Sequence, residues 1–319
     1  MGCLDRKSDK PDPRNFKFRS IKTAEVIPAT FMDMYYKLLE VSGTNNDCQF
    51  YGDCTSYGGE IPKRYQEEKV LSRHFLYNAI KKISGRYDTE GDYLINAMKA
   101  LCKMGVCEEA YFPTVPAVSW LKYVMQEPSE DAKANALIHK GRTYWELDRN
   151  DFEEFKRAMS VFKTPLNFAM EWNVSYYNCP ASGHLPLPTG EWVGGHSLAV
   201  VGFDGVGIWG KNSHGKSWGK NGYFFIPYED WTKHSIATAF VLLDLNKNMI
   251  YKMNPVTGEQ YLLEDGLMIG FNIGDNIELD ILKSRGLNEQ PSAISEAELK
   301  NYKLYPLVNK DRLGDLFGI

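Results

Sequence analysis

The sequence contains no apolar run near the roughly 20 residues that a membrane-spanning helix requires, and its polar start, MGCLDRKSDK, lacks the apolar core of a signal peptide. Neither sign of charge dominates, because 37 Lys and Arg stand against 41 Asp and Glu, for a formal net charge of −4. Nucleic-acid-binding proteins usually carry a clear basic face. We therefore expect no membrane contact, no signal peptide and no nucleic-acid partner.

Cysteine is also scarce, since six in 319 residues are too few for a disulfide-stapled secreted scaffold. Cys102 and Cys107 are close in sequence, but no second Cys or His pair lies near them, as a structural zinc site would need. The glycine-rich segment 200–210 contains no GxGxxG motif followed by a helix, which argues against a dinucleotide site. We expect neither a metal nor an organic cofactor.

The chain changes character near Pro165. Before it, apolar residues recur at helical spacing, with Ser72 as a typical N-cap and Gly85 as a helix stop. Helices are predicted at residues 55–69, 72–83, 92–104 and 151–160. After Pro165, short aromatic and β-branched segments predict strands, with a hairpin turn at Asp204-Gly205. A helical half before a strand-rich half is typical of the α+β class.

Two stretches lie outside these halves. Residues 1–45 are predicted to form an N-terminal arm and a lead-in to a domain at 46–245. Residues 246–319 are predicted to form a small C-terminal α/β module, with a turn at 255–258 and a strand followed by a helix within 271–286.

Three segments carry residue types that suit nucleophilic chemistry. Cys54, in GDCTSYGG, precedes a predicted helix, whose N-terminal N–H groups favour a thiolate. A lone cysteine is otherwise more often a core residue. His196 opens an apolar strand in GGHSLAVVGF, and Asn212 ends the next strand in GKNSHG. A thiolate that attacks a carbonyl needs an imidazole to hold and return the proton, and a third group to orient that imidazole.

In the order of these pieces, from about Asn46 to Asp244, the chain resembles the papain-like cysteine peptidases. The motifs are GDC before a helix, LSRHFLYNAIKKISG, GVCEEAYFP, GGHSLAVVGFD and KNS followed by WG and GYFFIPY. The segment GDCTSY is similar to the corresponding segment in the branch of the family found in bacteria and their phages. The resemblance implies a helical lobe and a β-barrel-like lobe with a cleft between them. It also implies that Cys54 is the nucleophile, His196 the acid and base, and Asn212 the orienting residue, and Cys54 and His196 have the family's spacing of roughly 130–150 residues.

Several positions depart from the family pattern. The family's oxyanion-binding Gln lies six residues before the nucleophile, where this chain has Cys48, with Gln49 one residue later. Either Gln49 serves or the enzyme is slow or inactive, because losing one such donor costs about 100- to 1000-fold in rate; we favour Gln49. His214 replaces the usual Trp after the Asn, so the Asn–His hydrogen bond should be more exposed, whereas Trp218 matches the family's later, supporting Trp. Tyr51 replaces a disulfide cysteine, which agrees with a reducing compartment.

The resemblance implies a thiol hydrolase that cleaves peptide bonds through a Cys-His-Asn triad and a thioester, acting on polypeptides in the cytoplasm or in a virion. The alternative is a weak or inactive papain-like structural protein, such as a phage virion component that docks on protein assembly partners through its arm and tail. An acyl transferase or amidase with the same triad is a third possibility. If residues 1–25 lie in the cleft, removing them should raise activity.

Overall fold

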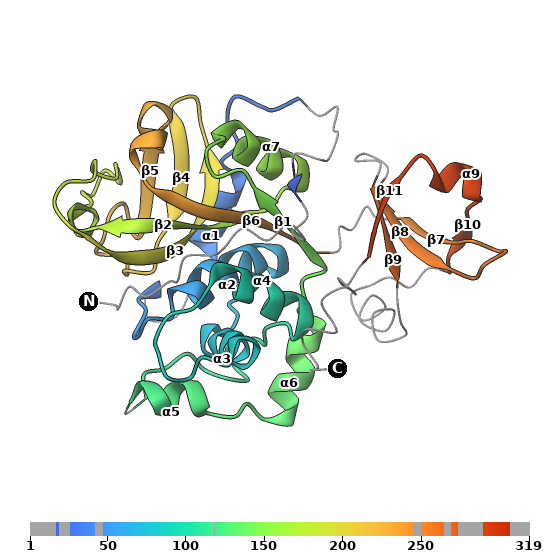
Figure 1. Ribbon diagram of the computed structural model, residues 1–319, viewed down its shortest axis with the longest axis horizontal. Coiled ribbons are helices and arrows are strands. Elements are labelled where there is room, and N and C mark those ends of the chain that lie inside the picture. Colours follow the sequence, from blue (N-terminus) through green and yellow to red (C-terminus); the bar gives the residue numbers. More distant parts are fainter. Residues whose placement is uncertain are drawn as a thin grey trace.

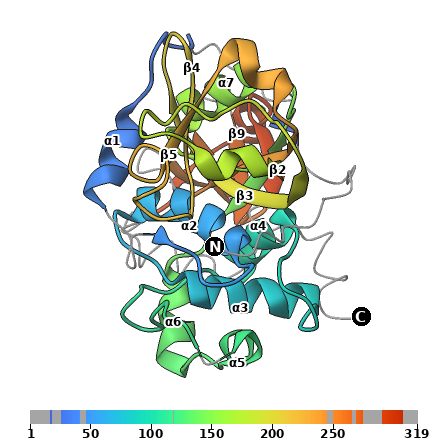
Figure 2. The same cartoon turned by 90° about the vertical axis from the view of Figure 1, so that its left-hand side faces the viewer.

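The computed structural model describes residues 17–18, 26–41, 47–117, 119–244, 250–264, 269–273 and 290–306. They form a helical lobe, a sheet lobe packed against it, and a small C-terminal sheet (Figures 1 and 2). The element order agrees with the predicted α+β class. Within these ranges, none of the helices combines the length and the apolar character that a bilayer crossing requires.

The helical lobe is built around a central helix. Its helices are α2 (Cys54–Glu67), α3 (Arg73–Ser84), α4 (Leu94–Lys103), α5 (Trp120–Met125) and α6 (Glu130–Ile138). The predicted N-cap is confirmed, because the Ser72 hydroxyl accepts the Phe75 N–H at 2.9 Å, and Gly85 ends α3 in a left-handed conformation with φ 67°. The residues of α2 from Cys54 to Arg64 are all buried, since α3 and α4 pack on one side and the sheet on the other.

The sheet lobe is a six-stranded antiparallel sheet in the order β1-β6-β2-β3-β4-β5. Its strands are β1 (Thr143–Leu147), β2 (Leu166–Asn173), β3 (Trp192–Phe203), β4 (Gly207–Lys211), β5 (Tyr223–Pro227) and β6 (Ile236–Leu243). It also holds α1 (Asp33–Glu40), α7 (Phe152–Phe162) and the 3₁₀ turns η3 (Val174–Asn178) and η4 (Tyr228–Lys233). The hairpin predicted at Asp204 joins β3 to β4, and the Asp204 carboxylate accepts the N–H of Val206 at 2.9 Å.

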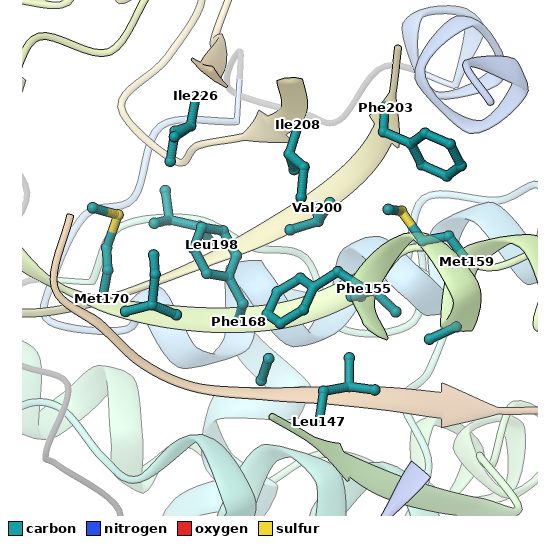
Figure 3. Packing of buried hydrophobic residues seen from close by; sticks show 14 of the residues in the cluster. Leu147, Phe155, Met159, Phe168, Met170, Leu198, Val200, Phe203, Ile208 and Ile226 are labelled. Carbon is teal, nitrogen blue, oxygen red and sulfur yellow. The ribbon is translucent and has the colours of Figure 1, made fainter. Parts of the chain in front are cut away.

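Successive residues of β3 face opposite sides of the sheet, as in any strand. Leu198 and Val200 enter a core shared with Phe155 of α7 (Figure 3). Ala199 and Val201 enter a second cluster with residues of α1 and α2. Both faces of the sheet are therefore covered, and β3 is the strand on which α2 packs.

Part of the N-terminal lead-in belongs to the sheet lobe. Phe18 is fully buried in its core, and its ring lies edge-on to Phe162 with 5.5 Å between centroids. Lys17 pairs with Glu146 of β1 at 2.6 Å. Deleting residues 1–25 would therefore remove a core aromatic ring. The rest of that arm lies outside the described residues, and so does the prediction that it occupies the cleft.

The C-terminal module is a five-stranded sheet in the order β10-β7-β8-β9-β11. Its elements are β7 (Ile250–Met253), β8 (Gln260–Glu264), β9 (Ile269–Ile273), β10 (Ser292–Ala293), α9 (Glu296–Leu299) and β11 (Lys303–Pro306). The predicted strand near 271 falls in β9, and the helix predicted after it lies outside the described residues. Tyr251 of β7 packs into the core of the sheet lobe. The domain boundaries at 45 and 245 stay predictions.

The close approach of α2 to β3 depends on Gly58. A Cβ at this position would clash with the Ser197 hydroxyl and lie 3.0 Å from the Leu198 carbonyl oxygen. Gly58→Ala should therefore push α2 off the strand and lower the free energy of unfolding by ~1–3 kcal/mol. Gly205→Ala is the matched control, because a Cβ there meets no atom within 4 Å. Urea unfolding of both variants measures the difference, and equal stabilities would contradict this role of Gly58.

Candidate active site

Cys54 begins α2, at the junction of the two lobes, and is fully buried. One turn later Gly58 contacts β3 at Ser197, the residue that follows His196. Asp53 occupies the N-cap position but makes no side-chain hydrogen bond to the helix N–H groups. The positive end of the helix dipole therefore acts at Cys54, where it favours the thiolate.

The Asp53 carboxyl points instead into the helical lobe, where the Tyr123 hydroxyl donates a hydrogen bond to it at 3.1 Å. Burial raises the pKa of Asp53 to about 7, although the hydrogen bond from Tyr123 and the charge of Arg73 lower it in part. In acidic solution Asp53 is therefore neutral. No fixed negative charge then sits at the residue that precedes Cys54.

His196 and Asn212 are brought together by the pairing of β3 with β4. The His196 Nε2 and the Asn212 Oδ1 lie 2.7 Å apart, and Oδ1 also accepts the Ser213 N–H at 2.7 Å. Both side chains are buried, with 0% of His196 and 4% of Asn212 exposed. With Nε2 bound to an oxygen, Nδ1 is the ring nitrogen that exchanges a proton.

Aromatic rings cover this pair. Trp172 of β2 lies edge-on to the His196 ring with 4.6 Å between centroids, and the His214 ring stacks on His196 at 4.9 Å. Trp218, which was predicted to support the site, lies 6.0 Å from Trp172 and donates its indole N–H to the Tyr176 carbonyl at 2.9 Å. The expectation that His214 leaves the Asn–His bond exposed is therefore wrong, because Trp172 and His214 together shield it.

Gln49 lies beside the same loop. Its backbone N–H donates to the Ser213 carbonyl at 3.0 Å, and its side-chain Oε1 accepts the Ser213 hydroxyl at 2.5 Å. Its Nε2 donates to the Tyr51 carbonyl at 2.9 Å, and an amide nitrogen carries two N–H groups. The neighbouring Cys48 is exposed, and its carbonyl accepts the Tyr57 hydroxyl of α2 at 2.9 Å. The structure thus buries Gln49 at the site and leaves Cys48 at its surface.

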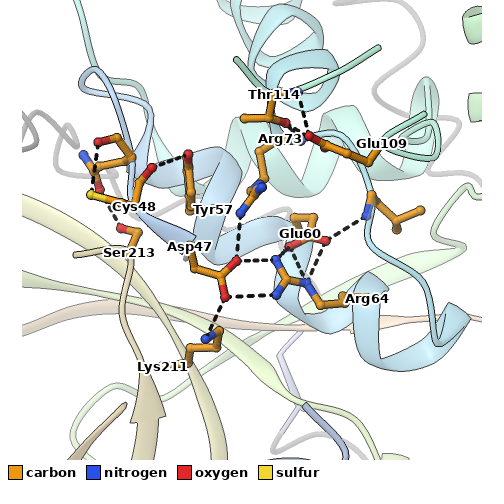
Figure 4. Close-up of polar contacts among 12 residues, drawn as sticks. Asp47, Cys48, Tyr57, Glu60, Arg64, Arg73, Glu109, Thr114, Lys211 and Ser213 are labelled. Carbon is orange, nitrogen blue, oxygen red and sulfur yellow. Dashed lines mark hydrogen bonds and ion pairs between the residues drawn. The ribbon is translucent and has the colours of Figure 1, made fainter. Parts of the chain in front are cut away.

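A buried ionic cluster, which we call the Asp47 cluster, holds these pieces together (Figure 4). The Asp47 carboxylate pairs with Arg64 of α2 at 2.9 Å, Arg73 of α3 at 2.8 Å and Lys211 of β4 at 2.9 Å. Glu60 pairs with Arg64 at 2.6 Å. Burial alone would raise the pKa of Asp47, but Arg64, Lys211 and Arg73 outweigh it and hold that pKa well below its usual range. The cluster joins both lobes two residues before Gln49.

The residues of the Asp47 cluster were not predicted from the sequence. Asp47, Arg64, Arg73 and Lys211 are spread over four segments and follow no periodic pattern. The Lys63-Arg64 pair in the predicted helix offered one signal, because a buried cation requires a buried partner.

The other described cysteines differ from Cys54 in setting. Burial raises the pKa values of Cys102, Cys107 and Cys179 to about 12, so these thiols stay protonated at neutral pH. No disulfide joins cysteines in the part of the chain that the structure describes. The same residues offer no group of three or more His, Cys, Asp or Glu side chains arranged for a metal ion.

Removing the Asp47 carboxylate should destabilise the fold. Asp47→Asn leaves three buried cations around a neutral group, so the free energy of unfolding should fall by ~3–5 kcal/mol. Glu127→Gln, which breaks an exposed pair with Lys82 at 2.9 Å, should cost under ~1 kcal/mol. Urea unfolding at neutral pH compares them. Similar losses in both variants would show that the three cations do not depend on Asp47 for compensation of their charge.

The raised pKa of Asp53 predicts a pH dependence of stability with a definite sign. The unfolded chain releases this proton near about pH 3.9, whereas the folded chain keeps it to about pH 7. The native state binds more protons across this window, so stability falls as pH rises, by at most about 1.4 kcal/mol per pH unit. Asp53→Asn removes the titration, so its stability relative to the wild type should rise from pH 4 to pH 7 and then level off.

Glu127→Gln serves as the control for Asp53→Asn, because the hydrogen bond from Lys82 lowers the pKa of Glu127. Its stability relative to the wild type should fall slightly, not rise, as the pH increases. Unfolding curves at half-unit pH steps measure both trends. A difference between Asp53→Asn and the wild type that does not change with pH would contradict the buried, neutral carboxyl.

Known proteins resemble the chain in both sequence and fold. The sequence model of the papain family cysteine proteases matches residues 60–242, which include His196 and Asn212 and begin six residues after Cys54. An uncharacterized peptidase C1-like protein of Acanthamoeba polyphaga mimivirus is 26% identical over 286 residues, covering 80% of this chain and 90% of that protein. Cathepsin B-like CP2 of Giardia intestinalis is 26% identical over 183 residues, 54% of this chain and 56% of that protein.

Solved structures share the fold at low sequence identity. Xylellain, a cysteine protease from Xylella fastidiosa, superposes with a TM-score of 0.60 and 23% identity over 76% of this chain and 96% of its own. A procathepsin B from Trypanosoma congolense superposes with a TM-score of 0.57 and 14% identity over 75% and 85% of the two chains. These likenesses confirm the two-lobed fold, and because the family match spans more than half of its length, the chain belongs to the papain family of cysteine proteases.

Proposed function

We propose that this protein cleaves peptide bonds with Cys54 as nucleophile, His196 as acid and base, and Asn212 as the residue that orients His196. The observation that carries the proposal is the 2.7 Å hydrogen bond between His196 Nε2 and Asn212 Oδ1, buried under Trp172. This bond fixes the tautomer in which Nδ1 faces proton exchange. The position of Cys54 at the start of a helix that packs on β3 supports its role as the partner of that nitrogen.

The reaction then follows in two halves. The Cys54 thiolate attacks the peptide carbonyl carbon, a C–S bond forms, and the oxyanion accepts hydrogen bonds from the Cys54 backbone N–H and from Gln49 Nε2. The His196 imidazolium gives its proton to the leaving amine as the C–N bond breaks, which leaves a thioester. His196 next takes a proton from water, the hydroxide attacks the thioester, and the C–S bond breaks to release the acid and restore the thiolate.

Access to this site requires motion. Cys54 and His196 are both fully buried, so a polypeptide reaches the sulfur only after the site opens. Such opening steps govern the turnover of many enzymes. We therefore expect turnover to depend on the opening of the site as well as on the chemical step.

The finer predictions follow from this function. We propose that the substrate is a polypeptide and that no membrane or nucleic acid takes part. The kinship with bacterial and phage enzymes stays a prediction, since the matching proteins include ones from a mimivirus, Xylella fastidiosa, Giardia intestinalis and Trypanosoma congolense. The location in the cytoplasm or a virion also stays a prediction. The inactive structural role stays the alternative, and a catalytic test separates the two.

The test compares hydrolysis of casein and of a mixed peptide library by four variants. Cys54→Ala should abolish hydrolysis, because no other group can form the thioester. His196→Ala should lower kcat by about 10²–10⁴-fold through loss of the acid and base, and Asn212→Ala should lower it less. Cys102→Ala, which changes a protonated buried thiol, should stay within about twofold of the wild type. Folded wild-type protein that hydrolyses nothing, or no faster than Cys54→Ala, would overturn the proposal in favour of a structural role.

A further inference from the structure

His214 does more at this site than cover it. Its Nδ1 lies 3.0 Å from the Asn212 Nδ2, and its ring stacks on His196 at an interplanar angle of 21°. An amide nitrogen has hydrogens to donate and no lone pair to accept with, so the His214 Nδ1 must be the acceptor. That requires His214 in its neutral form with the proton on Nε2.

The surroundings of His214 favour this neutral form. Burial lowers the pKa of His214 to about 4. The rings packed against it are Trp172 of β2, Tyr177 of η3 and Trp218, which carry no charge at neutral pH, and His196 of β3. His196 is the titratable ring in this set, and it becomes a cation during catalysis. A neutral ring can stack on that cation, whereas a second imidazolium would repel it.

The hydrogen bonds around Asn212 define one orientation of its amide. Oδ1 accepts from Ser213 N–H and from His196, while Nδ2 donates to His214. Rotating the amide by half a turn would place N–H groups of Nδ2 against two donors and the oxygen against the His214 lone pair. Phe or Trp at position 214 would leave Nδ2 buried without its acceptor.

We propose that His214 is a positioning residue, whose Nδ1 accepts a hydrogen bond from Asn212 and thereby holds the Asn212 oxygen on the catalytic His196. This inference rests on the proposed function of Cys54 and His196. It assigns His214 an acceptor role that an indole ring, whose nitrogen only donates, does not provide.

Three substitutions of His214 distinguish the effect of its hydrogen-bond acceptor from the effect of its aromatic ring. His214→Phe and His214→Trp keep an aromatic ring and lose the acceptor, whereas His214→Asn loses the ring and keeps an oxygen near the place of Nδ1. The first measurement is the second-order rate constant for alkylation of Cys54 by iodoacetamide. It is followed by peptide mass spectrometry at iodoacetamide concentrations where the rate is proportional to the concentration. The second measurement is kcat and KM for the hydrolysis of casein-derived peptides. Thermal unfolding checks each variant, and His214→Trp replaces His214→Phe if the latter does not fold.

The acceptor role predicts a definite order of rates. His214→Phe and His214→Trp should lower the alkylation rate and kcat by about tenfold, with KM nearly unchanged, and His214→Asn should recover most of the loss. In an Asn212→Ala background, His214→Phe should cause little further loss, because the amide that it positions is gone.

The outcomes distinguish the two proposals. Cys54 that reacts no faster in the wild type than in His196→Ala would refute the proposed function itself. Rapid, His196-dependent alkylation that His214→Phe leaves unchanged would refute the positioning role alone. Equal losses in His214→Phe and His214→Asn, or full additivity with Asn212→Ala, would also refute it, because the loss of rate would then not follow the loss of an acceptor for the Asn212 amide.

Discussion

The arrangement of the site depends on one buried carboxylate. Asp47 accepts charged hydrogen bonds from α2, α3 and β4 at once, so it ties the helical lobe to the sheet lobe at the place where both contribute site residues. Gln49 follows Asp47 by two residues, and Asn212 follows Lys211 by one. Buried ion pairs add little net stability because desolvation opposes the attraction, but they penalise any other arrangement of the same charges. The main effect of the Asp47 cluster is therefore to favour one arrangement of the two lobes over others.

The segment Asn212 to His214 adds a second tie. Asn212 hydrogen-bonds to His196, and Ser213 hydrogen-bonds to Gln49. His214 stacks on His196 and hydrogen-bonds to Asn212. The segment also bridges the Cys48 backbone. The base and the expected oxyanion donor thus share one rigid support. A displacement of this segment would disturb both at the same time.

The sequence predicted what is local or periodic. The helix that begins after Ser72 and the hairpin at Asp204 follow from caps, turn residues and alternation. The family resemblance predicted roles for Cys54, His196 and Asn212, of which the structure places His196 and Asn212 within hydrogen-bond distance. The Asp47 cluster was not predictable in this way, because its members have no fixed spacing and their charges resemble those of a solvated surface. The shielding of the Asn–His bond was misjudged for a related reason, since the covering Trp172 comes from β2 and not from the loop that carries His214.

The titratable groups near Cys54 and His196 differ in charge from the groups of the Asp47 cluster. In mildly acidic solution burial keeps both Asp53 and His214 neutral, so neither adds a charge beside Cys54 or His196 under those conditions. Permanent charges lie in the Asp47 cluster, where the carboxylates of Asp47 and Glu60 offset two of the three cations. In the proposed mechanism, the Cys54 thiolate and the His196 imidazolium stabilise each other, and the helix N-terminus and Asn212 add to that stabilisation. Burial alone disfavours both charges through desolvation, so the thiolate and imidazolium forms depend on these interactions to offset that cost.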